Sequence, residues 1–253
     1  MRMRVLGCSG GIGADLRTTA FLVDDDVLVD AGTGVGDLTV EEMGRIRHVF
    51  VTHSHLDHVA AIPLLVNSLF DRGESLVVHA QQATIDALRA HLFNWQIWPD
   101  FARLPTPETP ALRFEALEAG ETRRLNGRSF EAIQVSHAVP AVGYRCADAS
   151  GSVCFSGDTS SNETLWAALN HAGDLDLLVV EVVYPDHAEA QAREAMHYCP
   201  RLLARDLAQL DSRPRLAVTH LKPGQEDRIM AELHETLPDY ELHRLQRGDS
   251  FRL

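Results

Sequence analysis

Short apolar runs, separated by turn-forming residues, recur along most of the chain. Runs bounded by glycine, proline, aspartate or asparagine are typical of β-strands, and apolar residues at helical spacing predict amphipathic helices. The predicted strands cover residues 3–6, 19–23, 27–30, 48–52, 76–79, 112–116, 128–135, 142–146, 153–155, 175–183 and 216–218. The predicted helices cover residues 59–70, 82–93, 159–170, 198–210 and 226–237. This mixture predicts an α/β fold with two strand-rich halves, each closed by helices.

Length and composition predict the number of domains and the cellular compartment. The 253 residues, 45% of them hydrophobic and 23% charged, suit a single domain over residues 1–253 with a full core. No long apolar span or signal peptide is visible, so we expect no membrane segment. The four cysteines, at positions 8, 146, 154 and 199, lack metal-binding spacing. They predict free thiols and a cytoplasmic protein.

The net charge narrows the class of partner. A formal charge of −13 opposes non-specific binding to nucleic acid, so a nucleic-acid partner is not expected. A small anionic substrate remains compatible with this charge if metal ions dominate the local field.

The densest chemistry in the sequence follows the predicted strand at 48–52. His53, His55 and His58 lie within six positions together with Asp57. Imidazole nitrogen and carboxylate oxygen suit zinc and its first-row neighbours. Residues at i and i+2 of an extended segment point the same way, so His53 and His55 can converge on one ion, while Asp57 and His58 can serve a second. The alternative is an ordinary polar turn at a strand end.

Three more candidate ligands each follow an apolar strand: His137, Asp158 and His220. Singly, each histidine could be an ordinary loop residue and Asp158 could cap the predicted helix at 159–170. Together with the first cluster they make up the ligands of a two-metal site on loops at one edge of a sheet.

Two further segments are expected to support such a site. Asp30 is predicted to orient a metal-binding histidine through a hydrogen bond rather than to bind metal itself. The glycine-rich segment 7–13 is predicted to form a loop at the rim of the site. It is not interpreted as a dinucleotide loop, because residues 16–23 look extended where such a loop needs a helix.

The order His-x-His-x-Asp-His, then His, Asp and His, resembles the metallo-β-lactamase superfamily of binuclear hydrolases. The resemblance implies a four-layer αβ/βα sandwich with two divalent metal ions at the edge between its sheets. Zinc is the expected metal, with manganese or iron as alternatives. The resemblance assigns three residues to metal one, three to metal two and one to a bridge: His53, His55 and His137; Asp57, His58 and His220; and Asp158.

Three segments are similar to class II cyclic-nucleotide phosphodiesterases. They are Leu56 within the first motif, the insertion-like stretch 90–101, and the pair of segments 180–185 and 195–200. The chain departs from the class pattern at four positions that leave the ligands intact: Ala61, Pro63, Val66 and Cys199.

This resemblance implies hydrolysis of 3′,5′-cyclic nucleotides such as cAMP, with a hydroxide shared by the metals attacking phosphorus. The candidate catalytic residues are Asp57, His197 and Glu181. His197 is predicted to protonate the leaving oxygen or contact the phosphate, and Glu181 to hold its tautomer. Otherwise His197 is a surface histidine at a helix start, and Glu181 a buried carboxylate paired with another group.

An aromatic segment gives a candidate substrate contact. Phe93, Trp95, Trp98 and Phe101 fall within nine positions. They predict either a flap over the metal cleft that stacks on a purine, or core packing or a homodimer contact.

Other functions remain open at this stage. The nearest enzymatic alternative is a tRNA 3′-processing endonuclease, although Val180 stands where that family has histidine and no basic, glycine-rich arm is evident. Thioesterase or lactonase chemistry can use the same metals. A non-catalytic metal-binding scaffold does not require an open two-metal site, and a redox diiron protein would favour glutamate at the His55 position.

Overall fold

Two seven-stranded sheets form the centre of the computed structural model, which describes residues 1–253. The first sheet has the spatial order β14 (Ser250–Arg252), β1 (Arg2–Gly7), β2 (Ala20–Val23), β3 (Val27–Val29), β4 (His48–Phe50), β5 (Leu76–Ala80) and β6 (Leu112–Ala116). The second has the order β13 (Leu242–Arg244), β12 (Arg215–Thr219), β11 (Leu177–Glu181), β10 (Ser152–Phe155), β9 (Val142–Ala147), β8 (Arg128–Gln134) and β7 (Thr122–Leu125).

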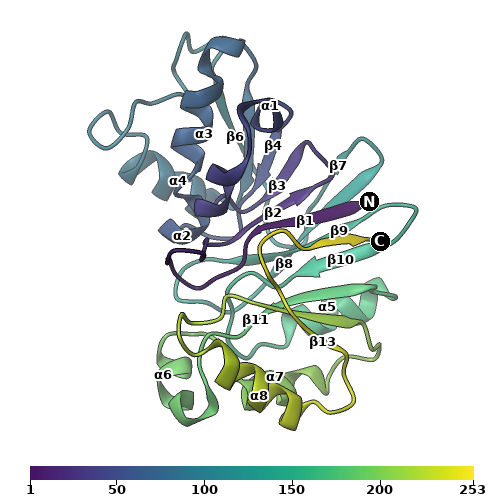
Figure 1. Cartoon of the computed structure of the whole chain (residues 1–253). Helices are drawn as coiled ribbons and strands as arrows, with labels where there is room; N and C mark the ends of the chain where they lie inside the picture. The colour runs from purple at the N-terminus through teal and green to yellow at the C-terminus, as the bar shows by residue number, and fades with distance from the viewer.

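Helices accompany each sheet in sequence order, as Figure 1 shows. With the first sheet are α1 (Val40–Met43), α2 (Leu56–Val59), α3 (Ile62–Leu69) and α4 (Gln82–His91). With the second are α5 (Thr164–Ala172), α6 (Glu189–Glu194), α7 (Pro200–Leu207) and α8 (Glu226–Thr236). Short 3₁₀ turns are η1 (Thr33–Asp37), η2 (Phe70–Arg72) and η3 (Asp186–Ala188). No helix combines the length and apolar character that crossing a bilayer requires.

Three apolar clusters hold the layers together. One joins α3 and α4 to the first sheet, and a second joins α5, α7 and α8 to the second sheet. The third lies between the sheets, where Phe50 stacks on Phe130 at 4.4 Å between ring centroids. This arrangement confirms the predicted four-layer α/β sandwich of the metallo-β-lactamase fold.

The register of the strands gathers the functional loops at one edge. In the first sheet β3, β4, β5 and β6 run parallel, and in the second β10, β11, β12 and β13 do so. A hydrogen bond from the Val142 amide to the Thr52 carbonyl, 3.0 Å long, joins the two sheets where β4 ends. Residues that follow these strands therefore emerge side by side.

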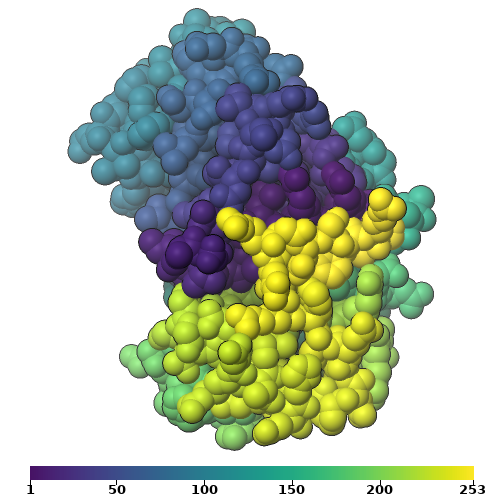
Figure 2. Space-filling model, in the orientation of Figure 1, coloured from purple at the N-terminus to yellow at the C-terminus, as the bar shows by residue number.

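The two ends of the chain complete the same sheet. β14 pairs antiparallel with β1, with Arg2 opposite Arg252. Figure 2 shows the N-terminal and C-terminal segments in contact on the surface. Three strands that the sequence did not predict, β7, β13 and β14, extend the edges of the sheets.

The helix predicted over 59–70 begins only at Ile62, as α3, and the short helix α2 precedes it, because the backbone of Ala31 separates the two. The Ala31 amide donates to the His58 carbonyl at 2.7 Å, and its carbonyl accepts from the Ala61 amide at 2.9 Å. Main-chain groups that bond to Ala31 cannot complete a continuous helical ladder.

The helix predicted over 159–170 begins only at Thr164, as α5. Thr159 instead ties the loop to Ser136, and the Asn162 side chain accepts from the Leu165 amide at 2.9 Å. Polar side chains that bond to the backbone in this way favour loops and helix starts. Asp158 is therefore not a helix cap. The four cysteines are free, as predicted.

We expect Phe130→Ala to lower the free energy of unfolding by about 3–5 kcal/mol, because it removes a fully buried ring between the sheets. Urea denaturation followed by circular dichroism measures the change. The control is Ile97→Ala, at a side chain that is 63% exposed. Equal stability losses in the two variants would show that the inter-sheet ring does not support the sandwich.

Candidate metal centre

Four of the predicted ligands converge where β4, β8 and β10 end. His53, His55, His137 and Asp158 each offer a ligand atom, and these atoms lie within 4.8 Å of one another. The His137 Nε2 atom is 3.2 Å from His55 Nδ1 and 4.0 Å from Asp158 Oδ2. His53 and Asp158 are almost completely buried. The fold therefore brings together predicted ligands that come from both sheets and are up to 105 positions apart in the sequence.

A second group lies directly beside the first. Asp57, His58 and His220 also place their ligand atoms within 4.8 Å of one another. His220 Nε2 is 3.2 Å from Asp57 Oδ2 and 3.3 Å from His58 Nε2. Asp158 Oδ2 is 3.4 Å from His58 Nε2 and 3.3 Å from His220 Nε2, so this carboxylate faces both groups.

The residues fit divalent metal ions. Tetrahedral ligands about 2.0–2.1 Å from zinc are separated from one another by roughly 3.3 Å, close to the distances above. Two buried atoms, His53 Nε2 and Asp158 Oδ1, have no hydrogen-bond partner. Buried polar atoms are normally satisfied, and a cation that binds nitrogen and carboxylate oxygen would satisfy both.

Asp30 holds the second group from behind, as the sequence predicted. Its fully buried carboxylate accepts from the Thr52 amide and hydroxyl, both at 2.8 Å, and from His58 Nδ1 at 2.7 Å. This bond fixes the proton on Nδ1 and leaves Nε2 free to face the site. The Met196 carbonyl fixes the ring of His137 in the same way, because it accepts from His137 Nδ1 at 3.0 Å.

Backbone conformation also shapes the site. Asp30, Met196 and His220 have φ values of 56°, 57° and 60°, in the left-handed region that non-glycine residues rarely adopt. Such strain persists only where surrounding contacts impose it. Gly10 permits one of these contacts, since a Cβ there would lie 2.8 Å from His220 Nδ1. The glycine-rich segment thus lies against the site, as predicted for a rim loop.

Burial and charge set the protonation of the histidines. Burial lowers the pKa of His53 well below its usual range and that of His137 to about 4. Both rings are therefore neutral and able to coordinate. Burial opposes a charged His58, but the Asp158 and Asp30 carboxylates prevail and raise its pKa well above the usual value. The negative charge of the same two carboxylates would also stabilise a bound divalent cation.

The predicted Glu181–His197 pair forms beside both groups. His197 Nδ1 is 2.8 Å from Glu181 Oε1, and the His197 ring centroid is 5.0 Å from that of His137 and 5.7 Å from that of His220. Glu181, at the end of β11, is fully buried and also accepts from the Thr159 amide at 3.0 Å. Although burial favours the neutral ring, the Glu181 carboxylate raises the pKa of His197 to about 9. The imidazole is therefore charged near neutral pH and can donate a proton.

Most of the predicted aromatic flap is not part of this site. The Phe101 carbonyl accepts from the amide of Leu112 at 3.1 Å, where β6 begins, so this end of the aromatic segment lies at the edge opposite to the metal-binding loops. Figure 1 shows the loop between α4 and β6 projecting away from α2. The end of the segment at Phe101 is therefore away from the metal centre.

Core packing explains most of this aromatic segment. Phe93 is 3% exposed and contacts Phe114, with ring centroids 6.0 Å apart. Phe101 is 4% exposed and contacts Phe70, and Trp98 packs against the same cluster. Trp95 is exposed. Most of the aromatics in this segment thus belong to the outer core of the first sheet. The predicted base contacts of Phe93 and Trp98 are corrected accordingly, whereas that of Trp95 stays a prediction.

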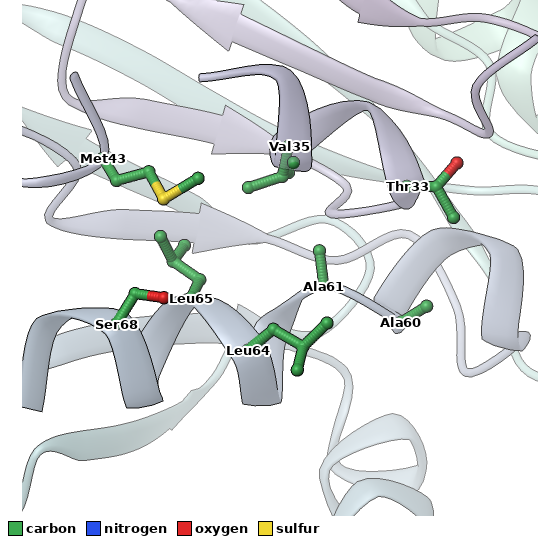
Figure 3. Close-up of a pocket in the computed structure, with 9 residues that line it drawn as sticks. Thr33, Val35, Met43, Ala60, Ala61, Leu64, Leu65 and Ser68 are labelled. Carbon is green, nitrogen blue, oxygen red and sulfur yellow. The ribbon is translucent and has the colours of Figure 1, made fainter. Parts of the chain in front are cut away.

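An apolar groove begins at Ala60, two residues after the predicted ligand His58, but no predicted metal ligand lines it. Figure 3 shows side chains from η1 and α1 facing those of α3 and of the turn that joins α2 to α3. Its lining has no charged residue: Thr33, Val35, Gly36, Met43, Ala60, Ala61, Leu64, Leu65 and Ser68. The groove therefore has no group that would hold a metal or a phosphate.

Sequence reasoning missed the supporting roles of Thr52, Thr159 and the Met196 carbonyl. Thr52 and Thr159 stand next to predicted ligands, which was a usable signal. The Met196 contact gave none, because any residue supplies a carbonyl and only the fold aims it.

Comparisons with known proteins agree with this geometry. The sequence model described as β-lactamase superfamily domain matches residues 26–235. A probable 3′,5′-cyclic-nucleotide phosphodiesterase of Yersinia pestis is 29% identical over 240 residues, which cover 81% of this chain and 67% of that protein. A ribonuclease Z of Haloferax volcanii is 38% identical over 91 residues, which cover 31% of this chain and 27% of that protein.

A solved structure extends the likeness to the whole fold. Unliganded yeast PDE1 superposes with a TM-score of 0.83, covering 100% of this chain and 99% of its own, at 19% identity. At this identity the likeness concerns the fold alone.

We expect Asp30→Asn to weaken zinc binding by about 10–100-fold, because an amide cannot hold both Thr52 and the His58 Nδ1 proton as the carboxylate does. Competition with a chromogenic chelator measures the affinity, and elemental analysis is expected to give two ions per wild-type chain. The matched control is Asp25→Asn, at a side chain that is 57% exposed and paired with Arg2. Equal zinc affinity in both variants would remove Asp30 from the support of the site.

Proposed function

Because the chain belongs to the β-lactamase superfamily, we propose that it is a two-metal phosphodiesterase acting on 3′,5′-cyclic nucleotides such as cAMP. The observation that carries the phosphodiesterase assignment is the Glu181–His197 pair beside two groups of metal-binding type. The narrower substrate is supported by the relative that shares the larger part of this chain, which is named as a cyclic-nucleotide phosphodiesterase.

In this proposal each of the two groups of residues would hold one divalent ion, and the Asp158 carboxylate lies within reach of ligand atoms of both groups. Divalent ions bound there supply Lewis acidity toward the phosphate and an activated water for attack at neutral pH. Zinc is the proposed metal, in keeping with the nitrogen and oxygen donors. Asp57 and His55 are both partly exposed, so both groups can be reached by a substrate from solvent.

His197 completes the reaction as a general acid. Attack on phosphorus breaks the bond to the 3′ oxygen, which leaves as an alkoxide unless a proton reaches it. The His197 Nδ1 proton is held by Glu181, so the proton that moves is on Nε2. The His197 ring becomes neutral as the 3′ hydroxyl forms, and the bond to Glu181 holds the ring in the same orientation throughout.

A tRNA 3′-processing activity is the second candidate, favoured by the 91 residues that are 38% identical to a ribonuclease Z. The net charge of −13 opposes it, because a folded RNA must be held through many phosphates. A cyclic nucleotide carries a single phosphate, and the metal centre alone can bind it.

A hydrolysis screen of the zinc-loaded protein tests the proposal. It compares cAMP, cGMP, bis(p-nitrophenyl) phosphate, a tRNA precursor with a 3′ trailer, an acyl-thioester and a lactone. We expect turnover of the cyclic nucleotides and the nitrophenyl diester, and loss of both on chelation. Cleavage of the tRNA precursor with no turnover of cyclic nucleotides would replace the proposed substrate with RNA.

We expect His197→Ala to keep both metals and to slow cAMP hydrolysis by about 10²–10⁴-fold, because the poor leaving group loses its proton donor. Bis(p-nitrophenyl) phosphate should suffer much less, since nitrophenolate leaves without a proton. His171→Ala, at an exposed histidine of α5, is the control. Equal losses on both substrates would assign His197 to phosphate binding or structure instead of acid catalysis.

A further inference from the structure

Lys222 is the only lysine in the chain and follows His220 by two positions. The backbone that carries it is fixed against the rim loop, because Leu221 bridges to Ser9 and its carbonyl accepts from the Gly10 amide at 3.1 Å. The single lysine thus stands on the loop between β12 and α8, beside the metal centre.

The side chain of Lys222 ends over Tyr184, whose ring is a neighbour of His197. Its Nζ atom lies over the Tyr184 ring, 4.7 Å from the centroid. The Tyr184 ring centroid is in turn 6.1 Å from that of His197. A tyrosine face attracts an ammonium group without neutralising it, so it can hold the cation ready for an anion.

Lys222 also differs from the neighbouring cations, which have partners. Arg201 is paired with Asp186, Arg244 with Asp227, and Arg228 contacts His187. The Lys222 ammonium has no carboxylate within ion-pair distance and no hydrogen bond; its contact is the Tyr184 ring. In a chain of net charge −13, an unpaired cation that is separated from the proposed proton donor by one aromatic ring calls for a functional explanation.

We propose that Lys222 and Tyr184 form an anion subsite that binds a non-bridging oxygen of the substrate phosphodiester next to His197. This inference rests on the proposed phosphodiesterase function and adds a residue that selects for a negatively charged substrate. Tyr184 is the positioning residue, and the flexible four-carbon stem of Lys222 lets the ammonium move from the ring to the phosphate. The same subsite would bind inorganic phosphate or a nucleoside monophosphate product.

The test compares Lys222→Met, which keeps the stem and removes the charge, with Lys222→Arg and with Arg228→Met as the matched control. Arg228 is exposed on α8, so its loss changes the net charge equally without touching Tyr184. Steady-state kinetics use cAMP and bis(p-nitrophenyl) phosphate, and calorimetry measures inorganic phosphate binding to the zinc-loaded proteins. Zinc content is measured for each variant.

A charge-assisted hydrogen bond of ordinary strength predicts that Lys222→Met raises KM for both diesters about 10–100-fold and weakens phosphate binding to a similar extent. Lys222→Arg should restore most of the affinity, while Arg228→Met should stay within about twofold of wild type, as expected for an exposed charge. Two zinc ions should remain in all variants.

Two results separate this inference from the proposed function. If Lys222→Met matches Arg228→Met in KM and in phosphate affinity, the subsite is wrong although the enzyme remains a phosphodiesterase. If the wild type does not hydrolyse cAMP, the proposed substrate is wrong. The effect of Lys222→Met on bis(p-nitrophenyl) phosphate and on phosphate binding then still decides the subsite.

Discussion

The position of the Asp158 carboxylate is the constraint on which the centre depends. It is almost fully buried, and its Oδ2 atom lies within 4.0 Å of nitrogen atoms of His53, His58, His137 and His220. These imidazoles come from both sheets, so the carboxylate faces them only if the carboxyl ends of β4, β8, β10 and β12 meet at one edge. Despite burial, His220 and His58 hold the pKa of Asp158 well below its usual range, which keeps the negative charge inside the protein.

Carboxylate–imidazole pairs are the repeated unit from which the site is built. Asp30 fixes His58 and Glu181 fixes His197, each through Nδ1. Removing one partner of a buried pair costs several kcal/mol, because the other charge is left uncompensated. The same unit serves two purposes here. It directs Nε2 of His58 toward the place where a metal ion would bind, and a proton toward the leaving oxygen in the proposed role of His197.

The loops at the two edges of the first sheet have different roles. Loops that follow the parallel strands carry the metal-binding groups, whereas the loop after α4 closes the core with Phe93 and Phe101. Three of the six non-glycine residues with a left-handed backbone, Asp30, Met196 and His220, lie beside the metal-binding groups. Contacts from neighbouring loops hold that strain in place, which is why the rim loop at Gly10 approaches His220 so closely.

The sequence by itself determined the α/β class, most of the strands and the ligand set. Local patterns sufficed for these, because apolar periodicity marks strands and His53, His55, Asp57 and His58 are adjacent in the chain. It also located Glu181 and His197 through their resemblance to a family. The edge strands β7, β13 and β14 gave weak signals, since short, half-exposed strands lack a strong apolar pattern.

Only the tertiary structure decided which groups meet. The backbone of Ala31 separates α2 from α3, so the helix predicted from residue 59 begins at Ile62, and α5 begins late because Thr159 and Asn162 bond to the surrounding loop. The tertiary structure also packs Phe93 and Phe101 of the aromatic segment into the core of the first sheet. A parallel strand followed by an antiparallel helix returns the chain to the opposite edge of the sheet, and this long-range geometry leaves no trace in local composition.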